Sequence, residues 1–444
     1  MAREQWGTKL GFMLAAMGSA VGLGNIWRFS FVAGNNGGGA FLLLYLVFVF
    51  LIGIPLLLAE VSIGRKAKSD VIGSYQKLAP GTPWFLTGFF GVFSAFLILS
   101  FYAVVAGWSL YYLFHYVTGD FFQAPAEGGY EGAFGGFITQ EWQPLFWSAL
   151  FMTMTIVIVF SGVKKGIETA NKVFMPLLAL LLLALAGVSL SLDGSMEGLS
   201  FLFRPDWSAL TQPSIYVQAL GQAFFSLSLG MGALLTYGSY LSDDKRLPGA
   251  AVGIGLMDTF FAVISGIVIF PAVFAFNIDP SSGPPLVFIT LPSIFEQMPL
   301  GGIAGLLFFF ALSLAALSSA ISILEVPTAY FMRLFRWSRT KASVIVGAIM
   351  FFLGISVSLG FGIWSGITPI GERNILDSMD YIASNILLPL GGLSMALFVG
   401  WYFTKSTALK AVDFGDNVIG NVWYGLVKYL LPVMIIIIFI SSIL

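Results

Sequence analysis

Cysteine is absent from this 444-residue chain, and histidine occurs once, as His115. Without cysteine there are no disulfides and no thiolate metal ligands, and one imidazole cannot build a metal centre of several histidines. Charged residues make up only 10% of the chain, and the net charge of −1 argues against nucleic acid as a partner. An enzyme is also a poor interpretation, because these absences leave no metal set and no nucleophile–base pair.

Apolar residues, by contrast, make up 58% of the chain, and its mean hydropathy is +0.91. A soluble protein of this length cannot bury so much apolar surface, so the surrounding solvent must be lipid. Apolar runs of about 20 residues indicate membrane-spanning helices, so the fold class is all-α and integral to the membrane. The sequence predicts eleven spans, near residues 8–34, 39–64, 84–117, 143–161, 166–191, 213–241, 249–276, 300–332, 341–361, 376–403 and 422–444.

The distribution of basic residues predicts the orientation of these spans. With a cytoplasmic N-terminus, 18 of the 21 Lys and Arg residues fall in cytoplasmic segments. The outer segment 118–141 then holds four acidic residues and no basic one. We therefore expect a multi-pass protein of the cell inner (plasma) membrane, with the N-terminus in the cytoplasm and the C-terminus outside.

Two of the predicted spans are interrupted by residues that disfavour helix. GSAVGLGN, residues 18–25, places three glycines and an asparagine inside the first span, and SLSLGMG, residues 226–232, interrupts the sixth. Interruptions five spans apart predict two inverted units, and in such repeats broken helices mark a binding site at mid-membrane. The units would cover about residues 8–191 and 213–403, followed by an extra helix near 422–444.

Four motifs carry a resemblance to a known family. They are GSAVGLGNIWRF (18–29), NGGGAF (36–41), FFSLSLGMGALLTYGSY (224–240) and ALSSAIS (316–322). The chain resembles the neurotransmitter:sodium symporter family, most closely the part of its bacterial amino-acid branch that takes several hydrophobic amino acids. The resemblance implies a single transporter domain over 1–444, a five-plus-five inverted repeat with spans one and six broken, and sodium-coupled uptake of amino acids or amines.

The resemblance also implies two sodium sites beside the break in the first span. Unwound helix frees carbonyl oxygens, which suit a small hard cation, and amides, which suit a carboxylate. Glycines here could instead form a helix-packing face, since small residues are common at such contacts. The first site would use Ala20, Asn25, Ser226 and Asp258, and the second Gly18, Val21, Ala315, Ser318 and Ser319.

A substrate site is implied next to these ions. The Tyr102 hydroxyl would bind the substrate carboxylate, although an aromatic residue in a span can equally serve packing. Gly22 stands where amine-specific relatives keep an aspartate, which favours a zwitterionic amino acid over a bare amine. Met231 is flexible and would admit aromatic and branched aliphatic side chains, with ordinary packing as the alternative. The implied substrate residues are Ser19, Ala20, Leu23, Gly24, Ile98, Tyr102, Phe225, Ser226, Ser228, Met231, Ser319 and Ile323.

Gates on both sides are implied as well. Arg28 and Asp380 match the family's outer ion pair, and Asp377, one turn away, could compete for the arginine. On the inner side, Arg3 matches the family's arginine, but Arg333 stands where its aspartate partner is found. The inner pair is therefore absent or rebuilt. Other residues that match the inner gate are Trp6, Ser239 and Tyr240.

Two further features have open interpretations. Glu60, deep in the second span, either lies as a charge near Arg65 or accepts amide hydrogen bonds from the break in the sixth span. Gly166 and Pro176 either allow the inner end of the fifth span to unwind, which in the family opens a water path, or form a kink that serves packing.

Together these observations predict a sodium-coupled symporter that imports hydrophobic L-amino acids, aromatic and branched aliphatic, by alternating access. The alternatives are an amino-acid sensor with the same fold and a transporter for another zwitterion. A channel is disfavoured because the polar residues cluster at mid-depth. The bilayer is a second partner, and the sequence leaves the oligomeric state open. Chloride is not expected to be required, because Asp258 replaces the asparagine of chloride-dependent relatives, whose other chloride-site residues match Tyr45, Gln222 and Ser226.

Overall fold

The computed structural model describes residues 4–123, 125, 128–243, 246–277, 286–298 and 300–443. The regular structure in these residues is all helical, as predicted. Nine helical stretches in the described chain are long and apolar enough to cross a membrane, or ten if the bent pair Lys9–Ala20 and Gly24–Asn35 counts as one span. The elements of the nine are α3 (Gly39–Phe48) with α4 (Ile54–Ala67), α6 (Phe85–Thr118), α8 (Gln143–Phe160), α9 (Thr169–Leu190), α13 (Pro248–Ala275), α15 (Gly301–Phe335), α16 (Arg339–Leu359), α17 (Ile375–Asp380) with α18 (Leu388–Leu397), and α20 (Val418–Gly425) with α21 (Leu431–Ile443).

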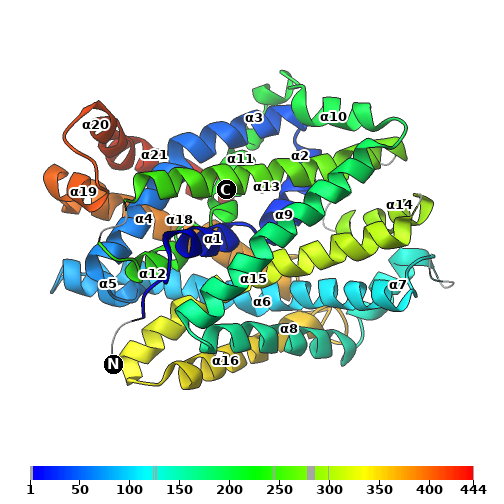
Figure 1. The fold of residues 1–444 in the computed structure, drawn as a ribbon, viewed down its shortest axis with the longest axis horizontal. Helices are drawn as coiled ribbons and strands as arrows, with labels where there is room; N and C mark the ends of the chain where they lie inside the picture. Colours follow the sequence, from blue (N-terminus) through cyan, green and yellow to red (C-terminus); the bar gives the residue numbers. More distant parts are fainter. Residues whose placement is uncertain are drawn as a thin grey trace.

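Helix α15 lies at the centre of the molecule and packs against α6, α9, α16 and α1 (Figure 1). Its middle section is almost wholly buried, although its sequence is as apolar as that of a lipid-facing helix. Helix α15 is surrounded by other helices rather than by lipid. It can therefore carry hydroxyls and a carboxylate, because other protein groups form hydrogen bonds and ion pairs with them. This central helix supplies one wall of the site described below.

The first of the two interruptions lies between Ala20 and Gly24. Helix α1 (Lys9–Ala20) ends at Ala20, and helical structure resumes at Gly24 in η1 (Gly24–Arg28), a π-helical turn, and in α2 (Phe29–Asn35). The two parts are bent by 50°. Backbone groups at the break therefore lack the partners that a continuous helix would give them.

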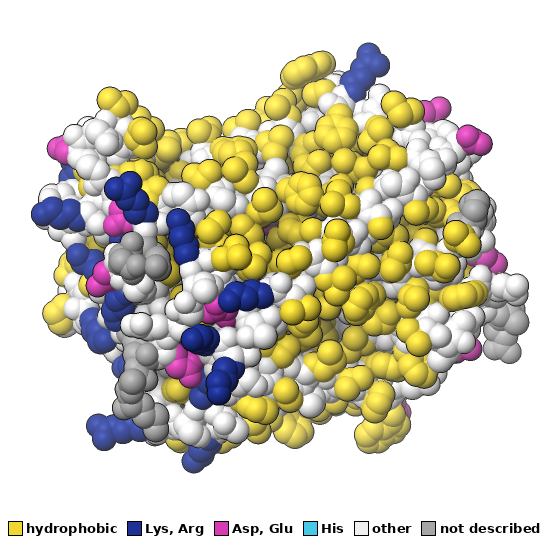
Figure 2. Space-filling view, in the orientation of Figure 1, with side chains coloured by type: hydrophobic (Ala, Val, Ile, Leu, Met, Phe, Trp, Pro, Cys, Tyr) yellow, Lys and Arg dark blue, Asp and Glu magenta, His cyan; other side chains and the backbone are white. Residues whose placement is uncertain are grey.

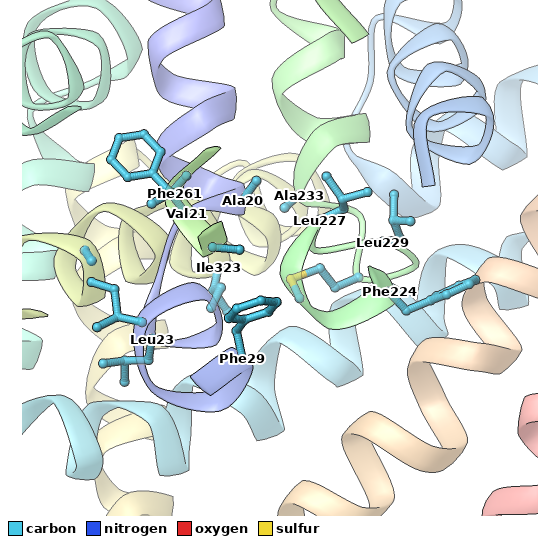
Figure 3. Packing of buried hydrophobic residues seen from close by; sticks show 14 of the residues in the cluster. Ala20, Val21, Leu23, Phe29, Phe224, Leu227, Leu229, Ala233, Phe261 and Ile323 are labelled. Carbon is cyan, nitrogen blue, oxygen red and sulfur yellow. The ribbon is translucent and has the colours of Figure 1, made fainter. Parts of the chain in front are cut away.

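The second interruption separates α11 (Pro213–Ser226) from α12 (Ala233–Ser239). Three residues in the gap, Ser228, Gly230 and Gly232, have φ values of 53°, 83° and 81°. Left-handed backbone of this kind cannot continue a right-handed helix, and glycine adopts it without a steric cost. Figure 3 shows the two interruptions in one view, with Ala20, Val21 and Leu23 on the first and Leu227, Leu229 and Ala233 on the second.

Several short helices occupy segments between the predicted spans. Their apolar runs are too short to cross a membrane, so a pattern of membrane-spanning lengths does not predict them. They are α5 (Val71–Leu78), α7 (Gly129–Ile138), α10 (Ser195–Phe203), the 3₁₀ turn η4 (Ala209–Thr211), η5 (Leu286–Thr290) with α14 (Leu291–Gln297), and α19 (Lys405–Ala411).

Five further π-helical turns lie in four of the spans, and the sequence did not predict them. Such turns leave a local bulge and are often found at functional sites. They are η2 (Val49–Gly53), η3 (Val163–Glu168), η6 (Tyr381–Leu387), η7 (Phe398–Tyr402) and η8 (Leu426–Leu430).

The surface has an apolar middle and a charged end, as expected for a membrane protein. Figure 2 shows apolar side chains over the middle of the visible face and Lys and Arg side chains gathered at one end. That end carries α5, α19 and the start of the described chain (Figure 1). An apolar belt between polar ends is the surface that a bilayer stabilises.

Candidate functional site

A buried cluster of polar side chains joins the two interruptions. The Asp258 carboxylate on α13 accepts hydrogen bonds from Ser226 Oγ (2.7 Å) and Asn25 Nδ2 (2.7 Å) at Oδ1, and from the Tyr45 hydroxyl (2.8 Å) at Oδ2. Asp258 is fully buried. All three of these groups donate to the carboxylate, an arrangement that suits its charged form, which only accepts hydrogen bonds. The structure thus brings together Asn25, Ser226 and Asp258, three of the four residues predicted for the first sodium site, and adds Tyr45.

Asn25 presents its amide nitrogen rather than its oxygen to this cluster. Nδ2 also contacts Ser226 Oγ (3.0 Å), while Oδ1 accepts from the backbone N–H of Gly22 (3.1 Å). A sodium ion between Asn25 and Asp258 would need an oxygen from both. The amide would therefore have to rotate by about half a turn, so that its oxygen faces the carboxylate.

A second oxygen cluster lies between α1 and α15. Ser318 Oγ donates to the carbonyls of Ala315 (2.9 Å) and Val21 (3.3 Å), and Ser319 Oγ lies 3.2 Å from the carbonyls of both Gly18 and Val21. All five residues predicted for the second sodium site therefore meet at one place. Uncharged carbonyl and hydroxyl oxygens are ligands that a small hard cation accepts.

A narrow cavity of about 20 Å³ lies between the two clusters. That volume has room for about one water molecule, so an amino acid would require the lining side chains to move apart. Eleven of the twelve predicted substrate residues line it, with Gly22 in place of Ser226, whose side chain is held by Asp258. The lining residues are Ser19, Ala20, Gly22, Leu23, Gly24, Ile98, Tyr102, Phe225, Ser228, Met231, Ser319 and Ile323.

Polar groups of this cavity sit at the break in α1, and apolar groups face them. The backbone N–H of Leu23 donates to the Tyr102 hydroxyl (3.3 Å), and the Ser228 hydroxyl donates to the carbonyl of Ser19 (2.9 Å). Gly22 faces Tyr102 and Ser319 so closely that a side chain there would displace them. One end therefore offers an amide and a hydroxyl to a carboxylate, and Ile98, Met231 and their neighbours form an apolar wall.

We expect Tyr102→Phe to weaken substrate binding by about tenfold to a hundredfold while leaving sodium binding near the parent value. The reason is the loss of one hydrogen bond to a charged carboxylate, worth ~1.5–3 kcal/mol. Binding of radiolabelled amino acid and of ²²Na⁺ to purified protein measures the two separately. Tyr112→Phe is the matched control on the same helix, since its hydroxyl donates to the carbonyl of Phe288 (2.6 Å), away from the cavity. Equal substrate affinity in Tyr102→Phe and the parent would remove Tyr102 from the site.

The whole length of the chain can be compared with known proteins. The model of the sodium:neurotransmitter symporter family matches residues 3–124 and 140–444. The chain belongs to this family. Among similar proteins, the sodium-dependent transporter YhdH of Bacillus subtilis (strain 168) is 40% identical, and the match covers 99% of this chain and 97% of YhdH. A sodium-dependent transporter of Haemophilus influenzae is 34% identical over 99% of this chain and 98% of its own length.

A solved structure supports the same assignment. The crystal structure of MhsT in complex with L-phenylalanine has 59% sequence identity and a TM-score of 0.94, and covers 99% of this chain and 100% of MhsT. The predicted resemblance to this symporter family and to its bacterial amino-acid branch is thereby confirmed. The family consists of transporters, so the chain is a transporter and not an enzyme.

Arg28 and Phe225 separate the narrow cavity from a second, larger one. The Arg28 guanidinium lies 4.5 Å from the ring centre of Phe225, and its NH1 is 3.4 Å from Gln222 Oε1. Phe225 lines both cavities, and the second, of about 320 Å³, is bounded by α11, α18 and α21. The two residues lie where a gate between the cavities would lie.

The predicted outer ion pair takes a different form. Arg28 and Asp380 interact electrostatically, but no direct ion pair joins them in the part of the chain that the structure describes. Asp380 instead accepts a hydrogen bond from Ser384 Oγ (2.7 Å). In this structure the guanidinium of Arg28 instead makes a cation–π contact with Phe225. Asp377 interacts with Arg373 and Asp380, which favours Asp380 as the acid nearer to the gate.

We expect Arg28→Ala and Asp380→Ala to lower transport by about tenfold or more while both variants still insert in the membrane. Arg28→Ala loses a partly desolvated cation–π contact, worth about 2 kcal/mol, and with it the barrier between the cavities. Uptake by cells, normalised to the protein found in the membrane, measures the effect. If Asp377→Ala lost transport and Asp380→Ala kept it, the acid of the gate would lie one turn earlier.

Glu60 on α4 is buried and faces the second interruption. Its carboxylate accepts hydrogen bonds from the backbone N–H groups of Gly230 (3.3 Å) and Leu235 (3.5 Å). Backbone amides freed by the left-handed turn thus find an acceptor. Of the two interpretations of Glu60, this structure favours the second. Arg65 pairs elsewhere, with Asp413 at 2.7 Å.

The residues predicted for the inner gate make contacts that differ from the family's pair. Arg333 forms an ion pair with Asp70, the residue that caps the N-terminus of α5. The substitution of arginine for aspartate at 333 is thereby accommodated by an acid from another segment. Arg3 lies outside the described residues. Trp6 donates from Nε1 to the carbonyl of Tyr237 (2.9 Å) and from its backbone N–H to that of Tyr240 (3.3 Å).

The sequence reasoning missed a buried ion pair on this side. Arg339, at the start of α16, contacts Glu325 of α15 at 2.6 Å, and the Tyr240 hydroxyl donates to the same carboxylate. Glu4 reaches Arg339 Nε at 3.0 Å. A glutamate inside the otherwise apolar run 300–332 was the available signal, because a charge in a span requires a partner.

The N-terminal segment is tied to the turn that precedes α9. Glu4 accepts from the backbone N–H of Val163 (2.7 Å), and Glu168 accepts from the backbone N–H of Gly7 (2.7 Å) and the hydroxyl of Thr8 (2.9 Å). Gly166 lies in the π-helical turn η3, pressed against the end of α8, and α9 continues through Pro176. Both interpretations of this stretch, unwinding and packing, remain open.

Proposed function

We propose that this protein is a sodium-coupled symporter that imports hydrophobic L-amino acids, aromatic and branched aliphatic, by alternating access. The observation that carries the proposal is the narrow cavity at the break in α1, with an oxygen cluster on each side of it. MhsT, at 59% identity, was crystallised with L-phenylalanine. A substrate carboxylate would meet the Leu23 amide and the Tyr102 hydroxyl, and an apolar side chain would meet Ile98, Met231 and Ile323.

Two sodium ions would use the two oxygen clusters. In the first, Asp258 supplies a negative charge, and the carbonyl of Ala20 would join it with Asn25 and Ser226. In the second, the hydroxyls of Ser318 and Ser319 bring α15 against the carbonyls of α1. Binding both ions would fix the broken helix against α13 and α15, so the substrate site becomes ordered when sodium is present.

The architecture would then be eleven spans, with α1 to α2 as the first and α11 to α12 as the sixth, both broken at mid-membrane. The repeats at about 8–191 and 213–403 would be inverted, and the helix near 422–444 would lie outside them. The basic end in Figure 2 supports a cytoplasmic N-terminus in the cell's plasma membrane.

The energy of two sodium ions suffices for steep accumulation. At ~100 mV each ion contributes ~2.3 kcal/mol, and a tenfold sodium gradient adds ~1.4 kcal/mol. Two ions then supply roughly 7 kcal/mol, enough for about a 10⁵-fold gradient of a zwitterion at tight coupling.

The experiment is uptake of a panel of radiolabelled amino acids into vesicles with an imposed sodium gradient. We expect accumulation of hydrophobic amino acids that stops when potassium or choline replaces sodium. Uptake that only equilibrates would indicate a channel, and binding without uptake would indicate a sensor. Accumulation unchanged without sodium would contradict the proposal.

A further inference from the structure

Asn171 on α9 carries a buried oxygen without a partner. Its side chain is fully buried, and its Oδ1 accepts no hydrogen bond from the described residues. The described part of the chain has eight such buried side-chain atoms, and the other seven are hydroxyls or an indole N–H. Asn171 Oδ1 is therefore the one pure acceptor among them. Native structures rarely leave a buried carbonyl unpaired, because nothing then offsets the loss of its hydrogen bonds to water.

The orientation of this oxygen is set by the other end of the amide. Asn171 Nδ2 donates to the carbonyl of Ile167, one turn earlier, at 2.9 Å. Rotating the amide by half a turn would bring Oδ1 against that carbonyl, and two acceptors repel one another. The side-chain oxygen is thus aimed away from its own helix and toward α1.

The oxygen lies beside Gly18 and close to Ser318, two residues of the second oxygen cluster. Asn171 Oδ1 occupies the place that a Cβ on Gly18 would take, and the Cβ of Ser318 lies 3.2 Å from the same place. Any side chain at Gly18 would separate Asn171 from the cluster. The glycine lets the oxygen of α9 approach the carbonyls of α1 and the hydroxyls of α15.

The described groups of the cluster offer this oxygen no hydrogen. The Ser318 and Ser319 hydroxyls already point at carbonyls of Ala315, Gly18, Ser19 and Val21. A site of several oxygens with no free donor suits a small cation. Resting on the proposed function, we propose that Asn171 Oδ1 is a sixth oxygen ligand of the second sodium site, contributed by α9 on its cytoplasmic flank.

This ligand would link the ion to the helix whose inner end leads to the cytoplasm. Asn171 lies between Gly166 and Pro176, and η3, tied to the N-terminal segment by Glu168, precedes it. Movement of this part of α9 would withdraw one ligand and weaken the site from the inner side. Sodium held by α9 would in turn favour the closed position of that segment.

The test measures ²²Na⁺ binding to purified full-length protein and the sodium concentration for half-maximal amino-acid binding. Asn171→Leu keeps the size of the side chain without its oxygen, and Asn171→Asp keeps an oxygen and adds charge. We expect Asn171→Leu to raise the sodium requirement about tenfold, the scale of one contact with a charge, and Asn171→Asp to lower it. Amino-acid affinity at saturating sodium should change in neither, because Asn171 does not line the cavity.

Two control variants show whether a change in the sodium requirement is specific to Asn171. Ser189→Ala removes another unpartnered buried oxygen from α9, near its outer end, and should leave the sodium requirement unchanged. Ser319→Ala removes a ligand of the second site and should raise it. A shift in Ser319→Ala with none in either Asn171 variant would overturn the role of Asn171 and leave the proposed function intact. Shifts of both Asn171 variants in the same direction would indicate a packing role and also overturn it. Absence of ²²Na⁺ binding to the parent would overturn the proposed function itself.

Discussion

Arg339→Met is expected to open the inner side of the proposed transporter at least about a hundredfold more often than in the parent. The substitution leaves Glu325 buried without the cation that now lies 2.6 Å away. Breaking a buried pair by removing one partner costs about 3–5 kcal/mol, because an uncompensated charge stays in the interior. Opening the inner side would let water reach that carboxylate, so the cost falls on the closed form.

The position of the pair explains why the effect should concern opening. Glu325 and Arg339 lie on the consecutive helices α15 and α16, whereas the other residues that contact them come from distant segments of the chain. Tyr240 follows α12, the second half of the interrupted helix, and Glu4 belongs to the N-terminal segment. In the proposed transporter these groups would have to separate before a path could form from the cavity to the cytoplasm.

The absence of cysteine makes the measurement direct, since one introduced thiol has no competitor. Thr328 is buried on α15, about one turn beyond Glu325. In a Thr328→Cys background, labelling by a maleimide should be slow, and Arg339→Met should accelerate it. Lys405→Met, which breaks the exposed Lys405–Asp416 pair at the same end, should not.

A double variant separates the lost pair from a general loss of stability. Glu325→Leu combined with Arg339→Met removes both charges, and apolar replacement of a buried pair is often neutral. Its labelling rate should lie nearer to the parent than that of Arg339→Met alone. If both variants were labelled at the parent's rate, the pair would not hold the inner side closed.

The two helix interruptions could be predicted from the sequence because helix breaking is a local property of the chain. The glycines at 18, 22 and 24 and at 230 and 232 break helices by themselves, so both interruptions could be placed to within a few residues. Eleven of the twelve lining residues that the family resemblance implies do line the cavity. Ser226 is the exception, since its hydroxyl faces Asp258, a partner 32 residues away. Some of the eleven, such as Tyr102 on α6 and Ser319 on α15, lie far from the breaks in the sequence, and only the resemblance could place them there.

Contacts between distant segments could not be predicted in the same way. The inner network joins Glu4, Tyr240, Glu325 and Arg339, and no spacing in the sequence pairs residues that far apart. Arg333 could be seen to break the family's pair, but its new partner, Asp70, lies 263 residues away. The contacts of Arg28 at the outer gate could not be predicted either, because side-chain positions decide whether its guanidinium contacts an acid or an aromatic ring.

Transport is expected to need no chloride in the parent and to acquire that need in Asp258→Asn. Chloride-dependent members of the family, which this chain resembles, have an asparagine at this position. Here the Asp258 carboxylate takes hydrogen bonds from Tyr45 and Ser226, two of the groups that match the chloride site. Gln222, the third, donates to the carbonyl of Gly24 (2.9 Å). The negative charge beside the first sodium site would therefore be part of the protein.

Electrostatics accounts both for the exclusion of chloride from the parent and for the chloride requirement expected in Asp258→Asn. Two like charges about 4 Å apart repel by ~4 kcal/mol at an effective dielectric of 20, so a chloride ion would be excluded beside Asp258. In Asp258→Asn the Tyr45 and Ser226 hydroxyls lose their anionic acceptor, and the first sodium ion loses a charged ligand. We expect uptake without chloride to fall at least tenfold in this variant, and chloride to restore part of it.

The measurement is sodium-driven uptake in chloride and in gluconate, for the parent and for Asp258→Asn. Asp377→Asn, which neutralises an acid near the outer gate, controls for the loss of a charge elsewhere. Chloride should stimulate Asp258→Asn alone, and with saturation, because a bound ion replaces one carboxylate. Parent uptake that collapses in gluconate would refute the assignment. An Asp258→Asn variant that stays inactive in both salts would show that chloride cannot replace the carboxylate, so that Asp258 is needed as a direct sodium ligand.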